Sequence, residues 1–449
     1  MHEDKATMKR IPLLSFIGVI TLVTLAITSC HDDLDDPRFT DSMVKAGIYA
    51  SMAEWYYWND KMPARVDFDA YRNYEDLLDA LTFSELDRWS YLTTPDAFDK
   101  AFTGQNIGHG FGWGLAEDRD LYLTFVYNDA PAGKDGWKRG WKVIQVNGKP
   151  VAEYKTNTGY DFQLGPAESG TSNSFTFELP NGTTTTRTIV KAAYQSNSIL
   201  HQSIIDVNGK KTGYLVYNSF KATAGLKPTQ SQEVEEAFNA LEEANISELI
   251  IDLRYNGGGS VRVAEQLMNR IVPPAADGTI MYTNQHNHNK TDMDKSVHFS
   301  KKGNISLDRV IFITARGSAS ASELTINCLM PYMEVKLVGQ STYGKPVGAF
   351  PLSDFNKNLK ERNVELVPIT FSTANANGTA EYFDGFPVDY EAIDGVSYDW
   401  GNINEPRLAA ALHYIEKGSF PARSRKLPSK TSWVMIDDFE GLAKEFPAY

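Results

Sequence analysis

The chain has 449 residues, 42% of them hydrophobic and 22% charged, and its formal net charge at pH 7 is −13. This length and composition indicate a folded protein of two or three domains and exclude a disordered chain. The acidic balance argues against nucleic-acid binding, and two cysteines are too few for a disulfide framework or a cysteine-based metal site.

The N-terminal segment has the pattern of an export signal. The basic pair Lys9-Arg10 precedes the apolar stretch IPLLSFIGVITLVTLAI at residues 11–27, and small residues then lead to Cys30. Basic, apolar and small-residue segments in this order are typical of a secretory signal peptide. The apolar stretch is short for a membrane-spanning helix. Its ending, Ile-Thr-Ser-Cys, resembles the bacterial lipobox.

The lipobox resemblance implies a lipoprotein signal peptide at residues 1–29 and a lipid anchor on the sulfur of Cys30. It places the chain in the cell envelope, as a lipoprotein of the outer membrane on its periplasmic face or at the cell surface. The acidic stretch HDDLDD after Cys30 predicts a linker over residues 30–40 that keeps the folded part off the membrane.

Helical patterns follow from Asp41 to Phe102, in the strings MVKAGIYASMAEWYYW, YEDLLDAL and LDRWSYLTTPDAFDKAF. They predict an N-terminal helical domain over residues 41–103. In the first string, apolar residues recur at the spacing of one helix face: Ile48, Met52, Trp55 and Tyr56. We expect this face to pack into a core rather than to bind a ligand.

A glycine-rich segment with strand patterns predicts a β-rich domain over residues 104–190. It contains GQNIGHGFGWGL, the alternating string DLYLTFVYN, and DAPAGKDGWKRGWKVIQVNGKPV. The last string resembles a PDZ domain in the order of its Ala-Pro-Ala, Asp-Gly and Asn-Gly elements, although Trp141 stands where an aspartate is usual. The resemblance implies that the loop and strand edge from Gly108 to Leu115 take a peptide C-terminus by strand addition.

The peptide-binding residues that this resemblance implies are Gly108, Gly110, Phe111 and Gly112. The alternative is a β-rich scaffold that binds no peptide.

Residues 191–422 have the alternating strands and helices of an α/β domain. Continuous apolar runs, typical of parallel strands buried on both faces, are expected to form strands at Gly213–Phe220, Glu248–Arg254, Val310–Arg316 and Val335–Gly339. Helices are expected at Glu233–Ala244, after YNGGGS, and from about Ala321, with Cys328 as a small buried residue. This order predicts a layered α/β core with helices on its sheet, followed by a C-terminal tail at residues 423–449.

Two strand-to-helix turns carry candidate chemistry. Asn256-Gly257-Gly258-Gly259 offers bare backbone amides but lacks the lysine and the glycine spacing of phosphate loops, so an oxyanion site is favoured. GSASASEL, from Gly317, leads a buried strand into a helix N-terminus, where free amides and the helix dipole stabilise a serine alkoxide. The same Ser and Glu spacing also forms a helix-capping box, so capping alone is an alternative.

A nucleophilic serine needs a base, and none of the 8 histidines stands in the context of a triad. Lys345, however, follows the predicted strand Val335–Gly339 within QSTYGKP, between a glycine and a proline. Burial of an inward-pointing lysine lowers its pKa and makes its neutral amine a usable base. Serine–lysine pairs are an established variant of triad chemistry.

Three motifs in order, IDLRYNGGGS, SASASEL and VGQSTYGKP, follow the PDZ-like string. Together they resemble the carboxyl-terminal processing peptidases, also called tail-specific proteases, over roughly residues 80–415. The resemblance implies a layered peptidase core of the crotonase/ClpP-like type, with the PDZ-like domain upstream. Some relatives place a glutamine four residues after the lysine, where this chain has Ala349, so no third catalytic residue is assigned.

The site residues that the family resemblance implies are the nucleophile Ser320, the base Lys345, the oxyanion-binding amides of Ala321 and of Gly258 or Gly257, and Glu323 in support of the helix start or of the lysine.

The sequence thus predicts an exported serine endopeptidase that requires no metal or other cofactor. Its expected partners are protein or peptide substrates with unstructured C-termini, and the membrane through the anchor on Cys30. Two other functions fit the patterns: a non-catalytic envelope lipoprotein that binds peptides, and a hydrolase of small esters on the same core. The presence of both Ser320 and Lys345 speaks against the non-catalytic protein.

Overall fold

The structure is a computed structural model, and it describes residues 40–116, 120–157, 159–225, 228–422 and 434–435. The predicted signal peptide, Cys30, the acidic linker up to residue 39 and nearly all of the predicted tail lie outside the described residues. Within the described ranges, no helix combines the length and the apolar character that crossing a membrane requires.

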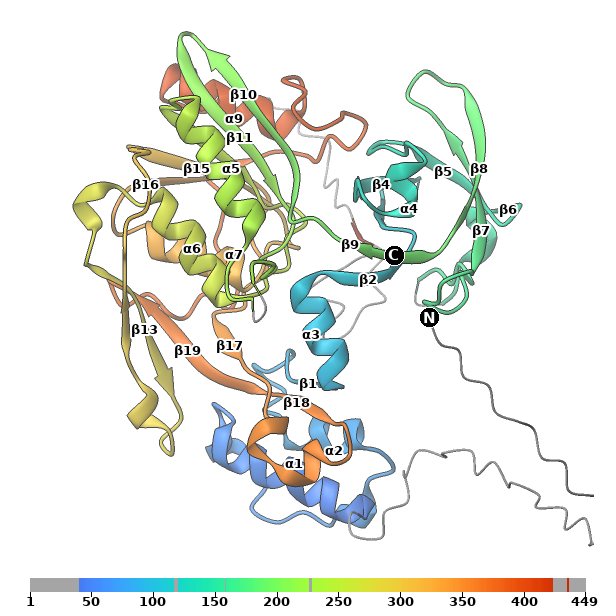
Figure 1. The fold of residues 1–449 in the computed structure, drawn as a ribbon, viewed down its shortest axis with the longest axis vertical. Coiled ribbons are helices and arrows are strands. Elements are labelled where there is room, and N and C mark those ends of the chain that lie inside the picture. The colour runs from blue at the N-terminus through green and yellow to red at the C-terminus, as the bar shows by residue number, and fades with distance from the viewer. Residues whose placement is uncertain (1–39, 117–119, 158, 226–227, 423–433, 436–449) are drawn as a thin grey trace, which may run out of the picture. The chain divides into compact units, whose positions relative to one another are not determined.

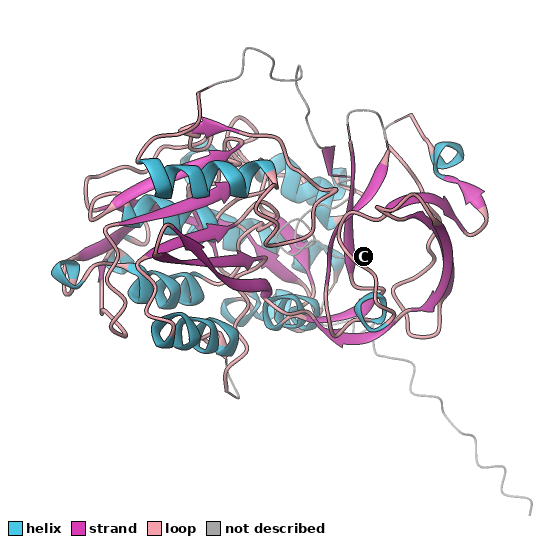
Figure 2. Cartoon of the chain, turned by 90° about the horizontal axis from the view of Figure 1, so that it is seen from above, coloured by secondary structure: helices cyan, strands magenta, loops and turns pink. Residues whose placement is uncertain are grey.

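A six-stranded sheet forms the centre of the α/β part (Figure 1; Figure 2). Its strands in spatial order are β10 (Ile199–Val207), β11 (Lys210–Tyr217), β12 (Glu248–Asp252), β15 (Arg309–Thr314), β16 (Glu334–Gly339) and β20 (Tyr390–Glu391). Neighbours from β11 to β20 are parallel, and β10 is antiparallel to β11. The expected α/β core is therefore confirmed.

Helices cover both faces of this sheet, which explains its continuous apolar strands. One face carries α5 (Gln232–Glu243), α6 (Val261–Ile271) and α7 (Ala321–Leu329), and the other carries α9 (Pro406–Lys417). Within β12, Leu249 and Ile251 pack under α5, α6 and α7, whereas Ile250 packs under α9. Each buried aliphatic side chain contributes about 1.5–3 kcal/mol, so burial on both faces stabilises the sheet strongly. Cys328 is also fully buried, as expected.

The N-terminal helical region packs against a second sheet. Its elements are α1 (Asp41–Trp55), α2 (Tyr74–Leu81), β1 (Tyr91–Thr93) and α3 (Pro95–Thr103). The second sheet has the order β14 (Ser296–His298), β13 (Ile280–His286), β19 (Ile369–Asn375) and β17 (Val347–Ala349). Ile48, Met52 and Tyr56 are fully buried in a core that also contains residues of α2, β17 and β19, so the predicted apolar face of this helix serves packing.

The helical expectation for the string from Leu86 to Phe102 is wrong in its first half. There the chain forms β1, which pairs antiparallel with β18 (Glu365–Val367). The helix begins only at Pro95, whose fixed φ suits a first helical turn. Thr94 caps it by accepting the Ala97 amide at 3.2 Å. A pairing partner far along the chain decided this segment, and local periodicity does not report it.

The β-rich part forms a separate sheet with an aromatic core. Its order is β21 (Val434–Met435), β3 (Phe111–Leu115), β4 (Leu121–Val126), β5 (Lys142–Val146), β7 (Ser172–Glu178) and β8 (Thr184–Val190). The strand β6 (Lys149–Pro150) pairs with β5, and β2 (Gln105–Gly108) pairs with β9 (Ala192–Gln195). The helix α4 (Pro131–Lys134) lies between β4 and β5 in the chain. Phe111, Trp113, Phe175 and Phe177 are fully buried in this core.

Short elements complete the described chain. They are α8 (Lys357–Lys360) and the 3₁₀ helices Asn59–Lys61, Phe68–Ala70, Val151–Tyr154, Pro274–Ala276, Thr291–Met293 and Ser353–Phe355.

A buried ion-pair network joins the β-rich part to the α/β core. Arg139, between α4 and β5, donates to Asp394 at 2.5 Å and to the Tyr255 hydroxyl at 2.7 Å. Arg254 donates to the same Asp394 oxygen at 2.8 Å and to Glu405 at 3.0 Å. Burial opposes ionisation of Asp394, but the nearby guanidinium groups outweigh it and lower the pKa of Asp394. Removing one partner from such a network costs about 3–5 kcal/mol, because a buried charge is left unpaired.

Lys221 is a second buried charge at this junction, and it has no hydrogen-bond partner for its amine among the described residues. The residue is 1% exposed, and its amine lies 4.9 Å from the centroid of the Tyr127 ring. Burial lowers the pKa of Lys221 to about 7, although the nearby Glu233 favours the charged form. At neutral pH the folded protein therefore holds this proton weakly.

We expect Lys221 to make the stability of the protein depend on pH. Above its ordinary pKa of 10.5 the lysine is neutral in both states, and as the pH falls toward about 7 the unfolded chain binds the proton first. The unfolding free energy should therefore fall with falling pH, by up to about 1.4 kcal/mol per pH unit. Lys221→Met should lack this contribution. Urea unfolding of both proteins from pH 7 to 10 tests it, and a constant difference between them would contradict it.

Candidate active site

The three serines of the GSASASEL turn differ in what their hydroxyls do. Ser318 donates to the Leu253 carbonyl at 2.7 Å, and Ser322 donates to the Asn256 carbonyl at 3.0 Å. Both serines are fully buried, and both bonds tie the serine turn to the segment that follows β12. The Ser320 hydroxyl donates to neither of these carbonyls, and the residue is partly exposed. Of the three, Ser320 is therefore the serine that a substrate can reach.

Ser320 has a strained backbone at the start of α7. Its φ is 55° and its ψ is −114°, a combination that serine rarely adopts. Such a residue costs about 1–3 kcal/mol and persists only where its surroundings hold it. Ser320 and Glu323 also form the capping box of α7. Capping and a nucleophilic role are thus compatible in the same residue.

The glycine turn lies directly against Ser320. A Cβ atom on Gly258 would lie 2.8 Å from the Ser320 Cβ, and the φ of Gly258 is 115°, so only glycine fits there. The Asn256 carbonyl also accepts the Ala319 amide at 3.1 Å. The two turns meet because β12 and β15 are adjacent parallel strands whose carboxyl ends lie at one edge of the sheet.

The predicted oxyanion amides differ in their availability. The Ala321 amide is at the first position of α7 and has no acceptor among the described residues, and the same holds for the Gly257 amide. The Gly258 amide, in contrast, donates to the side chain of Asn256 at 3.0 Å. Within the described part of the chain, the Ala321 and Gly257 amides are therefore free to donate, and the Gly258 amide becomes a donor only when Asn256 releases it.

A single carboxylate, that of Glu323, connects the serine turn with the lysine loop. Its Oε2 atom accepts the amide of Ser320 at 3.1 Å and the amide of Lys345 at 2.8 Å. Its Oε1 atom accepts the Thr342 hydroxyl at 2.6 Å and the Gly344 amide at 2.7 Å. Ser320 and Lys345 therefore have their backbones fixed to the same oxygen atom, although they lie in different loops.

Both Lys345 and Glu323 are shielded from solvent. Lys345 is 6% exposed and Glu323 is fully buried. Burial raises the pKa of Glu323 above its ordinary value, and the hydrogen bonds from Thr342, Lys345, Gly344 and Ser320 oppose that rise. The carboxylate is thus costly to bury and is held by a full set of donors.

The predicted peptide-binding loop has two positions at which only glycine fits. At Gly110, φ is 84° and a Cβ atom would lie 2.0 Å from the Ala130 Cβ, so the turn before β3 requires glycine. A Cβ on Gly112 would lie 2.2 Å from the Phe125 ring. The Phe111 side chain is fully buried in the aromatic core, so only its backbone can contact a peptide.

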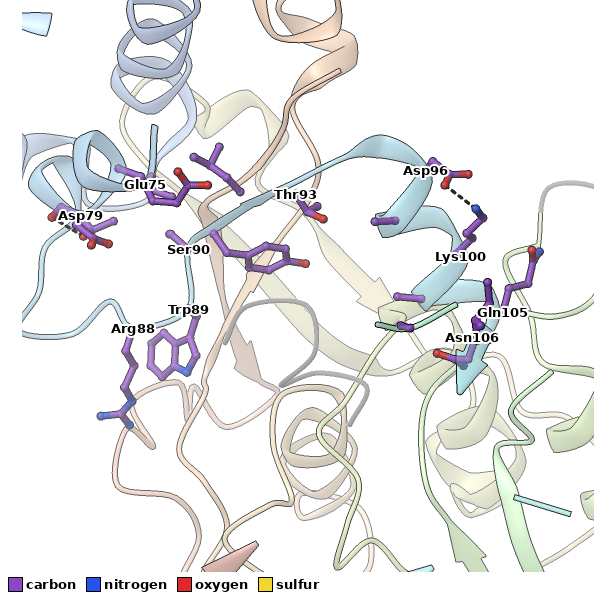
Figure 3. Close-up of a pocket in the computed structure, with 18 of the residues that line it drawn as sticks. Glu75, Asp79, Arg88, Trp89, Ser90, Thr93, Asp96, Lys100, Gln105 and Asn106 are labelled. Atoms are coloured by element: carbon purple, nitrogen blue, oxygen red, sulfur yellow. Dashed lines mark hydrogen bonds and ion pairs between the residues drawn. The ribbon is translucent and has the colours of Figure 1, made fainter. Parts of the chain in front are cut away.

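A cleft of about 1330 Å³ lies beside the N-terminal helical region, and its lining does not include Ser320 or Lys345 (Figure 3). Arg88 and Trp89 line one end, and Lys100, Gln105 and Asn106 line the other. The Arg88 guanidinium lies 5.3 Å from the centroid of the Tyr343 ring. Tyr343 precedes Gly344-Lys345, so the cleft starts next to the lysine loop and extends toward β2.

Asn256 and Thr342 each make several hydrogen bonds in the site, and the sequence predicted no role for their side chains. Asn256 accepts from the serine turn and holds the Gly258 amide, and Thr342 bridges Glu323 to the Phe386 amide at 2.7 Å. Asn256 stands inside the IDLRYNGGGS motif, which was a signal for it, whereas Thr342 has no signal beyond its place in QSTYGKP. Among the described residues, no group of three or more His, Cys, Asp or Glu side chains could hold a metal ion.

Two family models match the chain. Residues 211–357 match the model of peptidase family S41, and residues 43–91 match the peptidase S41 N-terminal domain. The first segment contains the glycine turn, Ser320 and Lys345.

Curated relatives are carboxy-terminal processing proteases. One from Bacillus subtilis is 26% identical over 294 residues, which cover 65% of this chain and 56% of that protein. A chloroplastic carboxyl-terminal-processing peptidase from Arabidopsis thaliana is 24% identical over 324 residues, which cover 69% of this chain and 58% of that protein. The match thus spans little more than half the length of these relatives.

A solved structure from Bacteroides fragilis, assigned to the S41 proteases, has the same fold. Its TM-score is 0.66 at 24% identity, and the match covers 83% of this chain and 97% of that one. At this identity the likeness concerns the fold alone.

Replacing Glu323 by Gln should destabilise the protein. The amide nitrogen of Gln cannot accept, so two of the four donors lose their acceptor, at about 1–3 kcal/mol for each. We expect a loss of about 2–6 kcal/mol in the free energy of unfolding, measured with urea. The exposed Glu381→Gln serves as the control and should change stability by less than about 0.5 kcal/mol. Equal stability of the two variants would show that the carboxylate does not hold the site.

Proposed function

The chain is a member of peptidase family S41, and from this premise we propose that it is a serine endopeptidase with a Ser320–Lys345 dyad. One observation supports the dyad above all: the amides of both residues bind the same oxygen of the buried Glu323. The proposed dyad thus combines a strained serine at a helix N-terminus with a lysine that is shielded from solvent.

The proposed reaction is acyl transfer to serine. A neutral Lys345 amine accepts the proton of the Ser320 hydroxyl while the oxygen attacks the scissile carbonyl carbon. The tetrahedral intermediate collapses when the protonated lysine returns this proton to the leaving amine and the C–N bond breaks. Water, deprotonated by the same amine, then attacks the acyl-enzyme. The ester bond to the Ser320 oxygen breaks, the protonated lysine returns the proton to that oxygen, and the new carboxyl end of the substrate is released.

The oxyanion of the intermediate needs donors that already point at it. The Ala321 amide supplies one, and Gly257, or Gly258 after its release by Asn256, supplies the other. Each such donor contributes about 3 kcal/mol to the transition state in hydrolases of this kind. This step needs no cofactor, because backbone dipoles stabilise the charge.

The proposed substrates are proteins or peptides with unstructured C-terminal tails. The edge of β3 offers main-chain groups for an extended segment, and the cleft lined by Arg88, which contacts Tyr343, offers a path toward the lysine loop. We also propose that the chain is exported and anchored in the cell envelope through Cys30.

We expect Ser320→Ala and Lys345→Ala to lower kcat for an unstructured tailed peptide by about 10⁴-fold or more, because each removes one half of the proton transfer. Release of a fluorescent fragment measures the rate. The exposed residues Ser306 and Lys302 provide matched controls, and Ser306→Ala and Lys302→Ala should cleave at the parent rate. A Ser320→Ala protein that cleaves as fast as the parent would end the proposal.

The two other candidate functions give different results in the same assays. A non-catalytic peptide-binding protein would bind the tailed peptide and cleave nothing. A hydrolase of small esters would cleave an activated ester with the parent dyad and leave the tailed peptide intact. The endopeptidase is distinguished by Ser320-dependent cleavage of the peptide.

A further inference from the structure

The edge strand of the β-rich sheet is already occupied by another segment of the chain. In β21, Val434 pairs with Leu115 and Met435 pairs with Gly114, antiparallel to β3. The strand β4 covers the other side of β3. The described chain otherwise ends at Ala422, so β21 comes from the far end of the sequence and returns to the sheet.

Without β21, β3 would be an open edge of a kind that proteins avoid. Its sequence, Phe-Gly-Trp-Gly-Leu, has no charge and no proline, and these are the usual protections of an edge strand. Phe111 and Trp113 point into the aromatic core, so the edge offers mainly backbone groups. An extended segment can therefore pair with it by main-chain hydrogen bonds alone.

The direction of β21 matches that expected of a captured peptide. Because the pairing is antiparallel, the chain runs from Leu115 toward Gly114, that is, toward the Gly108–Gly110 end of β3. Met435 is followed by further residues, so the pairing uses the middle of a chain and needs no terminal carboxylate. The register places the segment on the strand edge that the sequence predicts for peptide binding.

We propose that the β3 edge is a strand-addition site whose resident ligand is this chain's own segment around Val434–Met435. The segment occupies the edge until an extended peptide of another protein displaces it. That displacement by substrate rests on the proposed function, whereas the occupation of the edge does not. A tethered segment competes at a high effective concentration, on the order of millimolar, so weak pairing is enough.

The test uses the full chain with Ser320→Ala, so that no peptide is cut. The probe is a fluorescein-labelled peptide with the sequence of residues 430–440, KTSWVMIDDFE. Its dissociation constant, from fluorescence anisotropy, is compared between this chain and one that also carries Val434→Pro and Met435→Pro. Proline cannot donate to the ladder, so the edge should open and the dissociation constant should fall tenfold or more. Unchanged affinity, or no binding to either protein, would overturn the proposal.

The matched control carries Val434→Thr and Met435→Thr, which keep the backbone amides and favour a strand. This control should bind the probe as weakly as the chain with its own Val434 and Met435. If it binds as tightly as the proline variant, backbone pairing is not what holds the segment. Deuterium uptake of residues 111–115 gives a second readout: it should be faster in the proline variant by tenfold or more, with β12 unchanged. Equal uptake would overturn the proposal.

Cleavage assays separate this inference from the proposed function. Suppose that Val434→Pro and Met435→Pro tighten peptide binding, but the chain with Ser320 intact cleaves no peptide. The peptidase proposal then fails, and the strand-addition site is supported. Suppose instead that the chain cleaves tailed peptides, but the two proline substitutions change neither the peptide affinity nor the deuterium uptake of residues 111–115. The peptidase proposal is then supported, and the proposal of a resident segment is refuted.

Discussion

The buried carboxylate of Glu323 is the constraint on which the candidate site depends. Its four hydrogen bonds come from two segments, the serine turn and the loop from Thr342 to Lys345. A buried donor without an acceptor is costly, so the carboxylate leaves each segment little freedom. The same contacts hold Ser320 in its strained conformation, whose cost they offset. The placement of the Ser320 and Lys345 backbones is thus a consequence of satisfying one buried charge.

The parallel sheet decides where this constraint acts. Because β12, β15 and β16 are parallel neighbours, their carboxyl ends bring the glycine turn, the serine turn and the lysine loop to one edge. Asp394 accepts from Arg254, which lies just before the glycine turn, and from Arg139 of the β-rich part. The ion pairs of Asp394 therefore join the β-rich part to the segment of the core that leads into the glycine turn.

Much of the core was predictable, because burial on both faces leaves a continuous apolar run that needs no partner to be recognised. The strand expected at Val335–Gly339 is β16, Glu334–Gly339, and the helix expected at Glu233–Ala244 is α5, Gln232–Glu243. The failure at β1 has the opposite cause: its partner β18 is distant in sequence. The ion pair between Asp394 and Arg139 could not be predicted for the same reason, because the two residues are distant in sequence and no motif contains both.

The sequence by itself determined the strands and helices of the core, the turns that require glycine, and the residue types of the candidate dyad, because periodicity and turn chemistry are local properties. Only the tertiary structure decided which donors are free: the Gly258 amide is held by Asn256, whereas that of Ala321 is not. Tertiary structure also decided that Val434–Met435 covers β3. Hydrogen-bond partners from distant segments are chosen by the packing of the folded chain, and no local pattern records that choice.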